Sequence, residues 1–170
     1  TEICKKIKLS KPTVKRVLRK FEEIKIFEAE KKGNTIFYTL KKTPAVNALL
    51  SLLEYDLTEY FLLRNNKIKY AVDELLKDKN ILTLLIFGSY AKNEAKKDSD
   101  VDILIVKNHD LKDIKISEEL SKKLYARTGL NFSIVLMNPE DLSKKNVFIA
   151  EIIEKHILVY GSELFYEMTS

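Results

Sequence analysis

Two apolar stretches with special residues at one end constrain the fold of this chain more than any other feature. Ile81–Phe87 is nearly all apolar and stops at Gly88-Ser89, which predicts a buried strand that turns into a helix. Asp100-Val101-Asp102 leads directly into a second apolar run, 103–106, which predicts another buried strand. Because side chains alternate along a strand, we expect both aspartates to point to one face of a sheet.

The residue types at these two strand ends suit a phosphate and a metal ion. A Gly88-Ser89 step between a strand and a helix presents backbone N–H groups and a hydroxyl to an anion. Two adjacent carboxylates repel each other unless a cation lies between them, and Mg²⁺ prefers carboxylate oxygens while keeping places open for phosphate oxygens. Solvated surface aspartates are the alternative, but the apolar run after Asp102 favours the edge of a buried strand.

The spacing of these motifs resembles a known signature. Phe87-Gly88-Ser89, ten residues and then Asp100-Val101-Asp102 is similar to the Gly-Ser and Asp-x-Asp motifs of the DNA polymerase β-like nucleotidyltransferases. It most resembles the minimal nucleotidyltransferases of bacteria and archaea, some of which are antitoxins that adenylylate a partner toxin. The resemblance covers about residues 67–165 and implies an α+β fold, with a mixed sheet flanked by helices.

The resemblance also implies roles for individual residues. Gly88, Ser89 and nearby N–H groups would hold the phosphates of ATP or another NTP. Asp100 and Asp102 would be the catalytic residues and would hold Mg²⁺ across the α-phosphate. Lys92 stands where the family often has an arginine, and would add positive charge near the triphosphate. Asn93 stands where a glycine is common.

The third carboxylate of active family members is missing from the expected strand, 131–137. Aligned on the Pro-Glu-Asp-Leu stretch that follows, this acid falls at Ser133, and a slip of two residues gives Asn131. Neither side chain is a general base at neutral pH, and losing such a base typically costs on the order of 10²- to 10⁴-fold in rate. Glu94 and Asp98 lie near the motif in sequence and are the candidate substitutes.

The N-terminal part of the chain is strongly basic. Residues 1–42 hold 13 Lys and Arg against 5 Asp and Glu, a net charge of +8, whereas the whole chain carries +5. The remaining residues, 43–170, therefore carry −3. A basic N-terminal part on a mildly acidic body predicts a polyanionic partner for that part alone; a solvated lysine-rich surface is the alternative.

The pattern within 1–42 predicts a DNA-binding domain. A short helix, a break at Leu9-Ser10, a basic helix and two strands around Lys32-Gly33-Asn34 follow the order of a winged helix-turn-helix, which this part resembles. We expect the first helix of that domain to be missing before Thr1. In this interpretation double-stranded DNA is contacted by the recognition helix and the wing tip, through Thr13, Lys15, Arg16, Arg19, Lys31 and Lys32.

The sequence predicts three parts: a winged helix-turn-helix (1–42), a helical connector (43–66) and a nucleotidyltransferase-fold domain (67–170). The connector has apolar residues on one helical stripe, including Leu53, Leu57 and Tyr60, and further leucines off it. It would pair two subunits into a homodimer or pack on the chain's own second domain. Later helices are expected at 67–78, 117–127 and 139–155, and a strand at 157–160.

The remaining composition is consistent with a cytoplasmic protein. The lone cysteine, Cys4, cannot form an internal disulfide, and no apolar run approaches the roughly 18 residues of a membrane span.

Three functions stay open at this stage. The first is a nucleotidyltransferase that acts on a protein or small acceptor. The second is a DNA-binding transcriptional regulator whose nucleotidyltransferase fold only binds nucleotide. The third is an antitoxin that docks a toxin partner and represses its operon.

Overall fold

The computed structural model describes residues 2–108, 111–144 and 146–169, and for 111–114 the backbone alone. It divides into two compact units, Thr1–Ala48 and Leu49–Ser170. The limits of 1–42, 43–66 and 67–170 stay predictions. None of the helices in the described part has the length and apolar content needed to cross a membrane.

The first unit contains two helices followed by a hairpin. Helix α1 (Glu2–Ile7) precedes α2 (Lys11–Glu23), whose N-cap is Ser10; its Oγ accepts a hydrogen bond from the Thr13 N–H. Strands β1 (Phe27–Lys32) and β2 (Thr35–Leu40) pair antiparallel, and Gly33 takes a positive φ of 61° between them. Val14 of α2 is buried, while the rest of the helix surface is largely exposed.

The second unit is built on a mixed sheet, as predicted. Its strands are β3 (Thr83–Phe87), β4 (Val101–Val106), β5 (Phe132–Met137) and β6 (Ile157–Tyr160), in the order β5-β4-β3-β6. Strand β4 runs parallel to β5, whereas β3 runs antiparallel to both β4 and β6. The buried middle strands are the apolar runs that the sequence marks.

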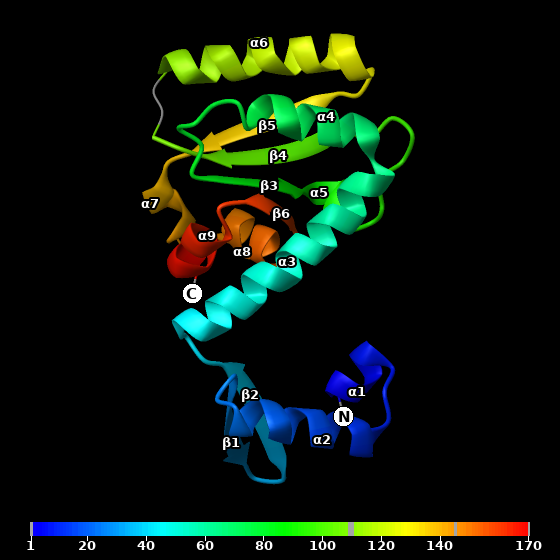
Figure 1. Ribbon diagram of the computed structural model, residues 1–170, viewed down its shortest axis with the longest axis vertical. Helices are drawn as coiled ribbons and strands as arrows, with labels where there is room; N and C mark the ends of the chain where they lie inside the picture. The colour runs from blue at the N-terminus through cyan, green and yellow to red at the C-terminus, as the bar shows by residue number, and fades with distance from the viewer. Residues whose placement is uncertain (1, 109–110, 145, 170) are drawn as a thin grey trace. The chain divides into compact units, whose positions relative to one another are not determined.

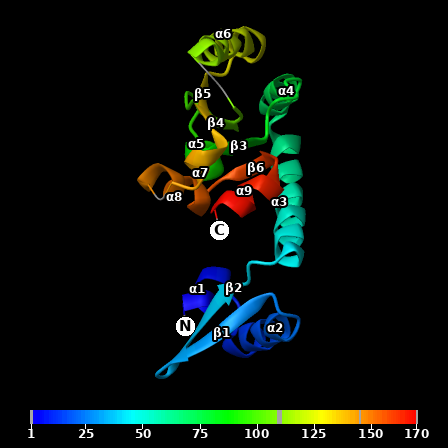
Figure 2. The same cartoon turned by 90° about the vertical axis from the view of Figure 1, so that its left-hand side faces the viewer.

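Helices cover both faces of this sheet (Figures 1 and 2). On one face, α4 (Asn66–Leu75) and α6 (Leu111–Thr128) pack against alternate residues of β3 and β4, such as Ile86 and Ile103. On the other face lie α7 (Pro139–Leu142), α8 (Val147–Glu154) and α9 (Ser162–Thr169), which pack against Leu85 and Leu104. The alternation of side chains therefore supplies both cores from the same strands.

The expected single helix over 139–155 is wrong. The chain forms α7 and α8 instead, because Asn146 begins a new helix: its side chain accepts a hydrogen bond from the Ile149 N–H at 2.9 Å. Helix α9 is an addition to the predicted elements, since the sequence pattern indicates only that Gly161 ends the last strand.

The long helix α3 (Pro44–Arg64) covers only part of the expected stripe: Val46 is buried, and Phe61 packs against the core of the second unit beside the buried Leu62. Leu53, Leu57 and Tyr60 are exposed. The helix contacts β6 and α9 through polar side chains: Thr58 donates to the Leu158 carbonyl at 2.9 Å, and Glu54 accepts from Tyr166 at 2.8 Å. These bonds attach the later part of α3 to the second unit. A homodimer formed through its exposed face stays a prediction.

Candidate functional site

The Gly88-Ser89 turn lies directly against the carboxylate of Asp102. Phe87, the last residue of β3, is paired with Asp102 across the antiparallel β3–β4 ladder. Gly88 then begins the short helix α5 (Gly88–Ala91) with a positive φ of 67°. A Cβ atom on Gly88 would lie 2.2 Å from Oδ2 of Asp102, so only glycine fits here. The strand pairing therefore brings the anion motif and the acidic motif into one site.

Asp100 and Asp102 differ in their surroundings. Asp102 is half-buried in β4, whereas Asp100 is exposed just before the strand. Burial raises the pKa of the Asp102 carboxyl, and the negative charge of Asp100 raises it further, while a hydrogen bond from Ser133 acts in the opposite direction. A cation bound between the two carboxylates would reduce their repulsion and stabilise the charged form of Asp102, and these two side chains could hold one.

Ser133 occupies the place beside Asp102 on the next strand. In the parallel β4–β5 pair Asp102 is the register partner of Ser133, and Asn131 lies before the strand, where its carbonyl accepts the Val101 N–H at 2.9 Å. The register selects Ser133, rather than Asn131, as the residue that a third acid would replace. In the described part of the chain, no cluster of three His, Cys, Asp or Glu side chains could hold a metal.

The candidate substitutes Glu94 and Asp98 are exposed on the loop between α5 and β4. The Glu94 N–H bonds to the Ser89 carbonyl at 2.9 Å, which closes the turn after α5. Asp100, and neither of these two acids, is the like charge that raises the Asp102 pKa. Asn93 takes a positive φ of 58°, a conformation that asparagine tolerates better than most residues. Asparagine therefore suits the backbone at this position, where the resemblance leads us to expect a glycine.

Lys92 is held by a residue that sequence reasoning missed. Its Nζ forms an ion pair with Oε1 of Glu151 on α8, and the hydrogen bond from this pair raises the Lys92 pKa. The two residues are 59 positions apart, so no local pattern could have indicated the contact. Next to this pair, the Phe87 and Phe148 rings pack edge to face with centroids 5.5 Å apart, which fixes α8 against the end of β3.

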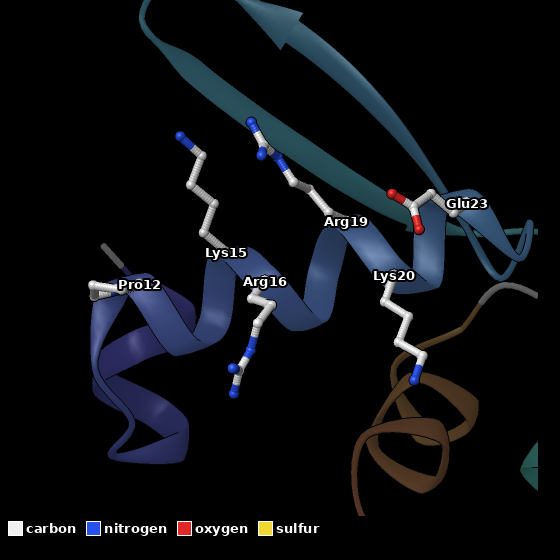
Figure 3. A pocket seen from close by; sticks show the side chains of 6 residues that line it. All are labelled: Pro12, Lys15, Arg16, Arg19, Lys20 and Glu23. Atoms are coloured by element: carbon white, nitrogen blue, oxygen red, sulfur yellow. The ribbon is translucent and has the colours of Figure 1, made fainter.

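The first unit presents a separate basic surface on α2. Pro12, Lys15, Arg16, Arg19, Lys20 and Glu23 line a hollow there (Figure 3). Lys15 and Arg19 point to one side of the helix and Arg16 and Lys20 to the other (Figure 3). Lys20 was not among the predicted contact residues.

Two of the other predicted DNA contacts, Thr13 and Lys32, already have partners within the protein. The Thr13 hydroxyl is 2.8 Å from that of Ser10. On β1, Lys31 is exposed, whereas Lys32 forms an ion pair with Glu30 at 3.0 Å. Glu28 also pairs with Lys41 at 3.3 Å, so the hairpin carries less unpaired positive charge than its lysines suggest.

The mixed sheet, with a glycine turn pressed against an aspartate pair, is the arrangement of a nucleotidyltransferase domain. Residues 66–163 match the family described as "Polymerase beta, Nucleotidyltransferase". The match covers more than half of the chain, which therefore belongs to this family.

One curated relative and several solved structures are similar to this chain. "Putative protein adenylyltransferase MJ1305" of Methanocaldococcus jannaschii is 31% identical over 94 residues, which cover 52% of this chain and 64% of the relative. The chain thus spans less than two thirds of that protein.

Two solved structures are similar to part of this chain. A toxin-antitoxin with AMP-PNP is 24% identical, with a TM-score of 0.45, and covers 59% of this chain and 82% of its own. A mutant of the toxin-antitoxin MntA-HpeT is 21% identical, with a TM-score of 0.46, and the match covers 61% of this chain and 82% of that structure's chain. Similarity at this level says nothing about what the present chain binds.

Proposed function

We propose that the second unit transfers a nucleoside monophosphate from ATP or another NTP to an acceptor hydroxyl, with Mg²⁺ held by Asp100 and Asp102. Membership of the nucleotidyltransferase family supports this reaction class. The observation that carries the proposal is the contact between Gly88 and Asp102, because it joins a phosphate-binding turn to the carboxylate that needs a cation.

In this reaction, the acceptor oxygen attacks the α-phosphorus, the bond from that phosphorus to the bridging oxygen breaks, and pyrophosphate leaves. Bound Mg²⁺ would supply charge stabilisation for the attacking and leaving oxygens. Ser89 and the N–H groups of the turn would orient the β- and γ-phosphates, and Lys92 would add positive charge once it leaves Glu151.

Within the described part of the chain, no third carboxylate stands in the β4–β5 register beside Asp102 to take the acceptor proton. Ser133 stands beside Asp102, and a serine hydroxyl is not a general base at neutral pH. We therefore expect slow transfer, in which water takes the proton. A protein hydroxyl is the proposed acceptor, because the curated relative is named as a protein adenylyltransferase.

We further propose that the first unit is a winged helix-turn-helix that binds double-stranded DNA. Lys15, Arg16, Arg19 and Lys20 gather on one helix, and the order of α1, α2 and the hairpin supports this fold class. With Ser133 in place of an acid, a DNA-binding regulator or antitoxin that holds nucleotide without turnover is the second candidate function. A toxin would then be its protein partner, and a cytoplasmic location would suit all of these functions.

Label transfer and calorimetry separate the two candidates. The full chain is incubated with α-labelled ATP and Mg²⁺, and ATP binding is titrated in parallel, for the wild type, Asp100→Asn, Asp102→Asn and the distant control Asp73→Asn. Transfer that both site variants abolish and Asp73→Asn retains supports the enzyme. Binding without transfer supports the regulator, and the absence of binding in a folded wild type overturns the nucleotide site.

A further inference from the structure

A second polar hollow lies in the second unit, apart from Asp100 and Asp102. It has a volume of about 330 Å³ and is lined by Asn66, Lys67 and Tyr70 at the start of α4, and by Arg127 and Thr128 at the end of α6. This volume is within the roughly 300–1,000 Å³ range of small-molecule sites.

The hollow and the aspartates lie at the same end of the sheet but on opposite faces. Thr128, which lines the hollow, lies three residues before Asn131. The Asn131 carbonyl accepts a hydrogen bond from the N–H of Val101, the residue between the two aspartates. Helices α4 and α6 cover the face to which Val101 and Ile103 point, whereas Asp102 shares its face with Leu104. A ligand in the hollow would therefore be held by different side chains from a nucleotide at Asp102.

Along the groove between α4 and α6, some basic side chains are paired with a carboxylate and others are not. Glu74 of α4 forms ion pairs with Lys123 of α6, at 3.6 Å, and with Lys77. One helical turn nearer the hollow, Tyr70 takes the place of Glu74 on α4, and Arg127 takes the place of Lys123 on α6. Tyr70 has no carboxylate to pair with Arg127. Among the described residues, neither Lys67 nor Arg127 has a carboxylate within ion-pair distance.

The two cations approach the hollow from different helices. Lys67 belongs to α4, yet its Nζ reaches to 3.8 Å from where a Cβ on Gly129 would lie, just beyond the end of α6. Arg127 is exposed in the last turn of α6, and Tyr70, which also lines the hollow, is 38% exposed. The Thr128 hydroxyl already donates to the Leu124 carbonyl at 2.8 Å, which leaves the cations, the Asn66 amide and the Tyr70 ring for a ligand.

We propose that this hollow binds a nucleotide without a metal ion, with Lys67 and Arg127 on the phosphate and Tyr70 stacked on the base. The two unpaired cations favour a ligand with a dianionic group such as a phosphate monoester. The Arg127 guanidinium and the Tyr70 ring favour a ligand whose other part is a flat ring, such as a base, over an aliphatic one. The five residues that line the hollow include no carboxylate that could hold Mg²⁺, so the proposed binding relies on the two cations alone for the phosphate charge. This site is independent of transfer at Asp102.

The test is calorimetric titration of AMP into the full chain in EDTA, with adenosine and inorganic phosphate as fragment probes. Arg127→Ala and Lys67→Ala should each weaken AMP binding by about 10-fold or more, as expected for charge-assisted hydrogen bonds. Tyr70→Leu should weaken it by about 5-fold or more, as expected when base stacking is removed. The matched controls are Lys122→Ala and Tyr125→Leu, which alter exposed residues of α6 outside the hollow.

Each result has a definite meaning. AMP binding that survives Asp100→Asn/Asp102→Asn and falls in the three hollow variants supports the proposal. Binding that the aspartate variants abolish, an equal loss in the control variants, or no AMP binding to folded wild type overturns it. Thermal unfolding of each variant identifies a change that only destabilises the α4–α6 groove, and a hollow variant that unfolds early but binds AMP normally also overturns the proposal.

Discussion

Ser133 lies beside Asp102 as its register partner in the parallel β4–β5 pair, and its side chain lowers the pKa of the Asp102 carboxyl. Ser133 is exposed, so the position has room for a larger polar side chain. The pair therefore defines the place where a third carboxylate can be introduced.

We predict that Ser133→Asp increases Mg²⁺-dependent label transfer, by up to about 10²- to 10⁴-fold, because it supplies a base next to the proposed metal ligands Asp100 and Asp102. Single-turnover transfer from α-labelled ATP measures this gain. Ser133→Asn, which is similar in size but lacks the charge, is the control. An unchanged rate in a Ser133→Asp protein that still binds Mg²⁺ and ATP would show that the missing acid does not limit the reaction.

Gly88→Ala should abolish ATP binding, because its Cβ would fall 2.2 Å from the Asp102 carboxylate at a positive φ. Gly33→Ala is the matched control: its φ is 61°, but nothing lies within 4 Å of its Cβ. Both variants carry a backbone strain of about 1–2 kcal/mol, which thermal unfolding measures. Equal ATP binding by both variants would contradict the close contact in the site.

Glu151→Gln should strengthen ATP binding a few-fold, because Lys92 no longer has to leave a carboxylate to reach the triphosphate. Lys92→Ala should weaken it, and Glu163→Gln on α9 should leave it unchanged. Calorimetry at constant Mg²⁺ compares the three variants. If Glu151→Gln and Lys92→Ala both weaken binding to the same extent, the ion pair holds the site together and Lys92 is not a phosphate ligand.

The half-buried group of Glu54, His156 and Tyr166 predicts a loss of stability in acid. Burial alone would raise the Glu54 pKa, but His156 and the Tyr166 hydroxyl, which donates at 2.8 Å, hold it below its usual value of 4.5. His156 Nε2 lies 3.6 Å from Glu54 Oε1, the same oxygen that accepts the Tyr166 hydroxyl.

Because the folded-state pKa of Glu54 is lowered, its stabilisation is fully present above about pH 4.5 and is lost as the pH falls through the lower folded value. Glu54→Gln should therefore reduce stability at neutral pH and flatten the acid limb of a plot of unfolding free energy against pH. Tyr166→Phe should cost about 1–3 kcal/mol, whereas Tyr160→Phe on the neighbouring strand should cost little. An unchanged acid limb in Glu54→Gln would contradict this assignment.

Arg16→Ala and Arg19→Ala should weaken duplex DNA binding and reduce the slope of log K against log salt by about 0.9 for each phosphate that the variant no longer neutralises. Fluorescence anisotropy at several salt concentrations measures this slope. Lys5→Ala removes one charge from α1 instead and controls for net charge. A slope that changes equally in all three variants would indicate nonspecific attraction rather than contacts made by α2.

The sequence alone was sufficient for the strands of the second unit, and the roles of the residues at their ends stay predictions. Apolar runs such as 103–106 can only be buried, and the alternation of side chains along a strand by itself assigns Asp100 and Asp102 to one face. Local signals also predicted β6 at its observed limits, 157–160, and the basic face of α2.

The tertiary structure decided what depends on distant residues. The β4–β5 register placed Ser133 beside Asp102, and packing across 59 residues gave Lys92 its partner Glu151. It also turned α3 so that Glu54 and Thr58 face β6 and α9 while Leu53 and Leu57 lie outside, because hydrogen bonds to β6 and α9 fix the helix rotation. Periodicity shows that a helix has an apolar face, but only the neighbouring elements determine which face is covered.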